Sequence, residues 1–128
     1  EFINYEQIIP SEFLTTVRVN RLAFLNSLER ASVVAKENKN LIKLDIKDNN
    51  INILSNSESG NVNENVIINL DGKDVNIAFN SKYLCDALKA AGDEFVNINM
   101  NSSISPCIIR PYSGEEYLYL ILPIRINS

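Results

Sequence analysis

The fold is decided near the end of the chain, by the stretch Glu116-Tyr117-Leu118-Tyr119-Leu120-Ile121-Leu122-Pro123-Ile124-Arg125-Ile126. Aliphatic residues crowd into it without alternating, which is typical of a buried central strand. Pro123 opposes that interpretation, because proline cannot donate to a strand ladder and belongs where pairing ends. Ile124 and Ile126 must therefore be covered by the rest of the domain or wait for a partner.

Composition predicts one globular domain with a core of its own. The chain has 128 residues, of which 45% are hydrophobic and 22% are charged, as in ordinary soluble domains. It has no apolar run of about 20 residues that would span a membrane. Cys85 and Cys107 lie far apart and outside any CxxC pattern, so we expect buried free thiols in a reducing compartment, the cytoplasm.

The residue types needed for catalysis are missing or badly placed. The sequence has no histidine, the commonest general base and metal ligand. Its four glycines form no phosphate-binding loop. Glu115 and Glu116 are adjacent on a predicted strand and point to opposite faces, so they would not share a substrate. We therefore expect a protein that is not an enzyme and that has no cofactor and no metal.

The sequence predicts the same order of secondary-structure elements twice. Residues 1–10 are expected to be an arm from a preceding domain, because the abrupt start indicates a fragment, and residues 11–128 one domain with repeats at about 11–72 and 73–128. Each repeat is predicted as a strand, a helix capped by Asn20 or Asn80, and three more strands, with the second helix stopped by Gly92. The predicted strands are 13–19, 41–46, 51–55, 62–70 before an Asp71-Gly72 turn, 75–79, 95–100, 107–110 and 117–126, and the helices are 22–36 and 81–91.

The outer faces of the two predicted helices differ. In the first helix, Val33 and Val34 fall off the stripe that must face the sheets, which indicates either incidental exposure or a contact with a partner. In the second, Lys82, Asp86 and Lys89 share the outer face. A solvated face and a face toward nucleic acid both fit that pattern, although the net charge of −4 argues against nucleic-acid binding by the whole surface.

Four segments occur in an order and spacing that resemble the C-terminal domain of the bacterial DNA polymerase III beta subunit, the sliding clamp; they are Phe2–Pro10, Leu28–Val34, Phe79–Tyr83 and Leu122–Ile126. The resemblance covers essentially the whole chain. It implies an α+β DNA-clamp fold, a duplicated β-α-β-β-β unit whose two helices pack on antiparallel sheets. It also implies a non-catalytic ring, a head-to-tail homodimer with three such domains per subunit, that encircles duplex DNA without sequence specificity and confers processivity in replication.

The resemblance further implies a groove for short peptide motifs of the polymerase, the clamp loader and repair proteins, typically a glutamine followed by aliphatic and aromatic residues. This chain's share of the groove would be Ile3, Gln7, Ile8, Asn80, Tyr83, Ile104, Pro106, Leu120, Ile121, Leu122, Pro123, Ile124, Arg125 and Ile126. By the same resemblance, Val33 and Val34 would meet the neighbouring subunit. Lys82, Lys89 and Arg21 would face DNA phosphates.

Departures from the family pattern bear on two of these expectations. Ile3 stands where many clamps have proline and Gln7 where arginine is frequent, so groove specificity is expected to differ. Residues 61–65 carry asparagines where the family often has acids, so we expect ring closure to depend less on salt bridges. A free-standing peptide-binding module, without ring or DNA, is the alternative function. An enzyme is the third class.

Overall fold

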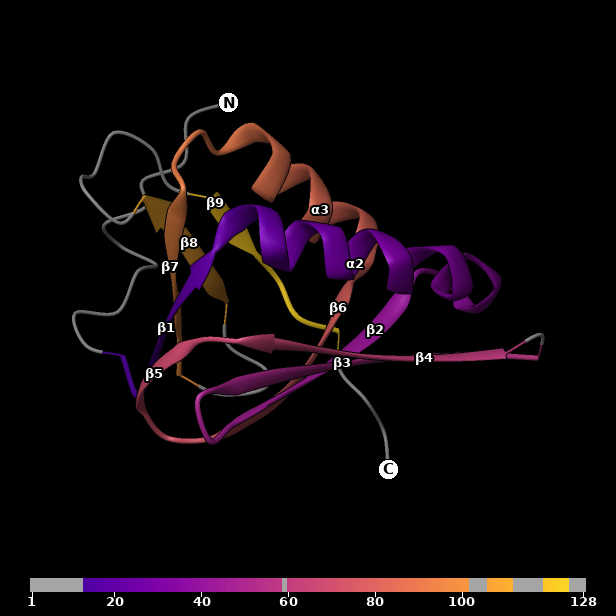
Figure 1. Cartoon of the computed structure of the whole chain (residues 1–128), viewed down its shortest axis with the longest axis horizontal. Coiled ribbons are helices and arrows are strands. Elements are labelled where there is room, and N and C mark those ends of the chain that lie inside the picture. Colours follow the sequence, from indigo (N-terminus) through magenta and orange to yellow (C-terminus); the bar gives the residue numbers. More distant parts are fainter. Residues whose placement is uncertain (1–12, 59, 102–105, 112–118, 125–128) are drawn as a thin grey trace.

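The computed structural model describes residues 13–58, 60–101, 106–111 and 119–124, and shows two helices lying side by side over antiparallel sheets (Figure 1). This confirms the predicted α+β class. In chain order the elements are β1 (Thr15–Asn20), α2 (Arg21–Ala35), a 3-10 turn η1 (Lys36–Asn38), β2 (Leu41–Lys47), β3 (Asn50–Ser57), β4 (Gly60–Ile67), β5 (Asn69–Gly72), β6 (Val75–Asn80), α3 (Ser81–Ala90), β7 (Phe95–Met100), β8 (Cys107–Pro111) and β9 (Tyr119–Ile121).

The two halves of the chain exchange their first strands. One sheet has the order β5-β1-β7-β8-β9 and the other β4-β3-β2-β6. β1 therefore pairs with β7 from the second half, with Thr15 opposite Met100. β6 pairs in the same way with β2 from the first half, with Asn80 opposite Leu41. Because each sheet needs strands from both halves, neither half is complete alone.

Asparagine side chains start both helices, as predicted. The Asn20 Oδ1 accepts a hydrogen bond of 2.8 Å from the Ala23 amide. The Asn80 Oδ1 accepts from the Lys82 amide at 2.9 Å. Each bond satisfies an N–H group that has no partner within its own helix.

The predicted inner faces of both helices are buried. Phe24, Leu28, Ala31 and Ala35 of the first half, and Leu84, Leu88 and Ala91 of the second, are 0–2% exposed. They join the buried faces of both sheets in one hydrophobic cluster. This cluster fixes α2 and α3 side by side on the sheets, and with them every surface described below.

Three local predictions were wrong. The strand predicted over 62–70 is divided into β4 and β5, which belong to different sheets. Asp71-Gly72 is not a turn but the end of β5, where Gly72 pairs with Thr15. The second helix, predicted to reach Ala91 and to be stopped by Gly92, already ends at Ala90, because Ala91 has extended backbone angles.

Candidate functional site

A groove with a volume of about 610 Å³ lies between the first turns of α3 and the end of the chain's last described strand. Most of its lining is apolar, and its side-chain polar groups are two tyrosine hydroxyls, one amide and one carboxylate. The lining residues are Asn80, Tyr83, Asp86, Ala87, Tyr119, Leu120, Ile121, Leu122 and Ile124. A groove with such a lining suits a largely apolar ligand.

The chain makes this groove by changing sheets. Ile121 of β9 pairs with Cys107 of β8 and is 7% exposed. Pairing stops before Pro123, which has no N–H to donate. Three residues after Ile121, the Ile124 amide donates a 2.8 Å bond to the Ala78 carbonyl of β6, in the other sheet. The segment between the two pairings passes from one sheet to the other, and its Leu122 lines the groove.

Two large apolar side chains that line the groove are exposed to solvent. Tyr83 is 63% exposed and Leu122 is 69% exposed. Asn80 both caps α3 and lines the groove. Its Oδ1 accepts hydrogen bonds from the backbone of α3, whereas its Nδ2 has no hydrogen-bond partner among the described residues. Within the described part of the chain, the groove thus offers apolar surface together with an amide donor that has no partner.

The structure brings together six of the residues predicted for the peptide groove: Asn80, Tyr83, Leu120, Ile121, Leu122 and Ile124. Pro106 and Pro123 are described but do not line it. Ile3, Gln7, Ile8, Ile104, Arg125 and Ile126 lie outside the described residues. The sequence reasoning missed Asp86, Ala87 and Tyr119. Helical spacing from Tyr83 would have found the first two, since positions three and four residues apart share a face.

A second hollow, of about 620 Å³, lies between α2 and α3. Val33 lines it and is 69% exposed, whereas Val34 is half-buried. Lys82 and Lys89 line it too. Lys89 is not a free cation, because its Nζ lies 3.4 Å from Glu29 Oε2.

Arg21, which the resemblance places toward DNA phosphates, forms hydrogen bonds within the chain. Its Nη1 donates to the Leu88 carbonyl at 3.0 Å and its Nε to the Asp93 carbonyl at 2.8 Å. A cation at carbonyls that end a helix is favoured by the helix dipole. The guanidinium thus ties the start of α2 to the end of α3.

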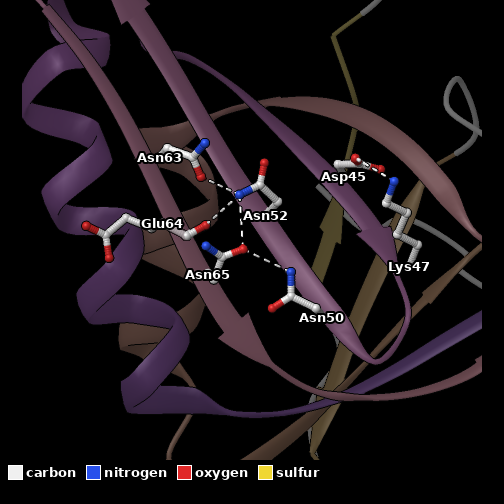
Figure 2. A network of polar contacts seen from close by, with 7 residues as sticks. All are labelled: Asp45, Lys47, Asn50, Asn52, Asn63, Glu64 and Asn65. Atoms are coloured by element: carbon white, nitrogen blue, oxygen red, sulfur yellow. Dashed lines mark hydrogen bonds and ion pairs between the residues drawn. The ribbon is translucent and has the colours of Figure 1, made fainter.

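An amide network covers the outer face of β3 and β4 (Figure 2). The Asn52 Nδ2 donates to Asn63 Oδ1 and, at 3.1 Å, to Asn65 Oδ1. The Asn50 Nδ2 also donates to Asn65 Oδ1, at 3.0 Å. Between these asparagines, Glu64 points away from the network to the other face. This edge strand is therefore held by neutral groups on its outer face.

Glu64 forms an ion pair within the chain. The Arg30 Nη2 lies 2.8 Å from Glu64 Oε1, and the two side chains are 59% and 24% exposed. This bond holds the pKa of Glu64 below its ordinary value, because the guanidinium stabilises the ionised carboxylate. The pair fastens α2 to β4.

Both thiols are buried and unpaired, as predicted. Burial raises the pKa of Cys107 to about 12, and burial also raises the pKa of Cys85. Within the described residues there is no group of three or more His, Cys, Asp or Glu that could hold a metal ion. In the same part of the chain, no helix combines the length and the apolar character needed to cross a membrane.

The two interlocked β-α-β-β-β halves, with paired helices on one side, define a domain of the DNA-clamp class. Residues 6–125 match the family model described as "DNA polymerase III beta subunit, C-terminal domain". The chain belongs to this family.

Its relatives agree with that assignment. The beta sliding clamp of Synechococcus elongatus is 34% identical over 131 residues, covering 100% of this chain and 35% of the relative. That of Bacillus subtilis is 36% identical, covering 92% of this chain and 32% of its own length. The crystal structure of the Thermotoga maritima DNA polymerase III beta subunit superposes with a TM-score of 0.93 at 37% identity, covering 99% of this chain and 35% of that one. This chain thus spans about a third of the length of these relatives.

Proposed function

We propose that the chain is the third domain of a ring-shaped sliding clamp, which encircles duplex DNA and confers processivity on a replicative polymerase in the cytoplasm. The match to the C-terminal domain of the beta subunit along residues 6–125 carries this proposal. The clamp does no chemistry itself. The ring is a homodimer closed head to tail, and the two remaining domains of each subunit lie outside this chain.

The groove beside α3 is the docking site for short peptide segments of the polymerase, the clamp loader and repair proteins. Leu122 and Tyr83 are the exposed apolar surface on which an aliphatic or aromatic anchor packs. The Nδ2 of Asn80, which has no partner among the described residues, orients the peptide by donating to a backbone or glutamine carbonyl. Buried anchors with a few placed polar groups are the usual design of such sites.

Val33 supports the proposed subunit contact. It is 69% exposed on α2, at the edge of the inter-helix hollow, where burial against a second subunit would remove apolar surface from water. Lys82, exposed on the same side of the helices, faces the DNA phosphates. Non-specific attraction of this kind keeps a ring close to DNA without fixing it at one sequence.

Peptide docking is tested on the full-length protein with a fluorescent peptide that carries a glutamine followed by leucines and a phenylalanine. We expect micromolar affinity, about −8 kcal/mol. Leu122→Ser should weaken it about five- to tenfold, because an exposed anchor surface of roughly one leucine is lost. Leu22→Ser, on a leucine 54% exposed at the start of α2, is the matched control. Equal affinity of the two variants would contradict the groove assignment.

Ring topology is tested by loading the full-length protein onto circular DNA and then cutting the circle. A closed ring stays on the circle and slides off the linear product. A free-standing peptide-binding module would show no dependence on cutting. For the interface, Val33→Asp combined with Val34→Asp should give monomers in sedimentation, whereas Leu22→Asp should remain a dimer. A dimer that survives the double substitution would refute the contact.

A further inference from the structure

Asp86 is the one described residue that the groove and the inter-helix hollow share. At about 100° per residue, Tyr83 and Ala87 lie on one side of it and Lys82 and Lys89 on the other. The first pair lines the groove and the second pair lines the hollow. Asp86 therefore stands on the ridge of α3 that separates them, with its carboxylate at the rim of the groove.

Asp86 is the only formally charged residue in the described lining of the groove. The other described lining residues are an amide, two tyrosines and aliphatic side chains. Asp86 forms no ion pair or hydrogen bond with the described residues. The nearby Lys89 is occupied by Glu29, at 3.4 Å. The rim thus has an exposed negative charge beside apolar surface, and no residue in the described part of the chain pairs with it.

We propose that Asp86 is a specificity residue of the groove, which selects peptides with lysine or arginine next to the apolar anchor and disfavours peptides with an acid there. This inference rests on the proposed peptide docking and names the chemistry of the preferred partner. A charge at the rim of an interface contributes mainly to discrimination between partners, because attraction to the right charge and repulsion from the wrong one add in the ratio of affinities. The effect is strengthened where a bound anchor excludes water from the groove.

The position of Asp86 separates this role from a structural one. Its side chain is exposed and holds no described neighbour in place. Asp86→Asn keeps the size and shape of the side chain and removes the charge, so the fold and the apolar part of the groove should be unchanged. A change confined to charge selectivity would therefore come from the carboxylate.

The experiment measures binding of two sets of three peptides to the full-length protein by fluorescence anisotropy. All peptides share a core of glutamine, leucine and phenylalanine, and one added position carries lysine, glutamine or glutamate. This variable position lies beside the aromatic end in the first set and beside the core glutamine in the second. We expect the lysine peptide of one set to bind about two- to fivefold more tightly than its glutamine counterpart, and the glutamate peptide more weakly by a similar factor, the range of exposed ion pairs. The ratio should shrink as salt is raised.

Asp86→Asn should bring the lysine-to-glutamate ratio close to one while the glutamine peptide binds as before. Asp71→Asn is the matched control, since it removes the same charge from β5, at the opposite edge of its sheet from β9, and should keep the wild-type ratio. An unchanged ratio in Asp86→Asn would overturn the assignment, and so would an equal fall in both variants, which would indicate net charge alone. Failure of the glutamine peptide to bind would instead overturn peptide docking itself, and the selectivity with it.

Discussion

Replacing Gly72 by alanine should strongly destabilise the domain, whereas the same change at Gly92 should not. Gly72 has a φ of +110°, a region that L-residues rarely adopt. A Cβ atom there would lie 2.0 Å from the Leu14 carbonyl oxygen and 3.2 Å from the Thr15 Cα. These are backbone atoms at the start of the paired strand β1, which cannot move aside as a flexible side chain would. At Gly92, no atom lies within 4 Å of the added Cβ.

The cost at Gly72 has two sources. The unfavourable φ contributes about 1–3 kcal/mol. The clash then forces β5 away from β1 and weakens two bonds beside it, from the Lys73 amide to the Leu14 carbonyl at 2.9 Å and from the Thr15 hydroxyl to the Lys73 carbonyl at 2.7 Å. With about 1 kcal/mol for each bond, Gly72→Ala should lower the free energy of unfolding by about 3–5 kcal/mol. Gly92→Ala should stay within about 1 kcal/mol of wild type.

Urea unfolding gives the free energies, and native-state hydrogen exchange locates the change in the full-length protein. Relative to wild type, Gly72→Ala should speed up amide exchange more in β1 and β5 than in β2 and β3, which belong to the other sheet. The reasoning would be refuted if Gly72→Ala remained within about 1 kcal/mol of wild type. It would equally be refuted if Gly92→Ala lost as much stability as Gly72→Ala.

Three further substitutions and reactions test individual residues. Arg21→Gln should cost about 1.5–3 kcal/mol of stability in urea unfolding, because a charged donor to two carbonyls is lost, but should leave retention on circular DNA closer to wild type than Lys82→Gln does. The folded state lowers the pKa of Glu64, so its pairing with Arg30 stabilises fully above pH 4.5 and is lost as the pH falls through the lower folded pKa; Glu64→Gln should flatten this part of the stability–pH curve, modestly because the pair is largely exposed. Iodoacetamide at pH 8 should modify Cys85, which is 5% exposed, before Cys107, which is 0% exposed and has a pKa of about 12. Mass spectrometry of the proteolytic peptides measures the two rates of modification, and unfolding in urea should make these rates equal.

Local physics made most elements predictable. The asparagine caps act within three residues of themselves, so Asn20 and Asn80 fixed both helix starts correctly. Helical spacing placed Leu28 and Leu88 on buried faces. The turn before β3 was also predictable, since Asp48 and Asn49 tolerate the positive φ values of 54° and 57° found there.

Non-local choices were not predictable. Asp71-Gly72 has the residues of a hairpin turn, but the chain uses the freedom of Gly72 to approach Leu14, a partner far away in sequence. Nothing in a single repeat says that its first strand pairs with the other repeat. Arg21 was assigned through the resemblance, which does not reveal its carbonyl acceptors, because these are brought near only by tertiary packing. The groove residues came from the resemblance, and the structure added Asp86 because it shows which side of α3 the groove occupies.

The final segment explains why the groove lies where it does. The halves exchange their first strands, so among the described strands β9 lies at the edge of one sheet and β6 at the edge of the other. Ile121 belongs to the first sheet and Ile124 reaches the second through Ala78. The residues between them include Pro123, which has no donor for either ladder. A segment that pairs at both ends and cannot pair in its middle leaves apolar side chains such as Leu122 uncovered. The apolar surplus noted in the sequence is therefore partly buried, at Ile121, and partly exposed, at Leu122.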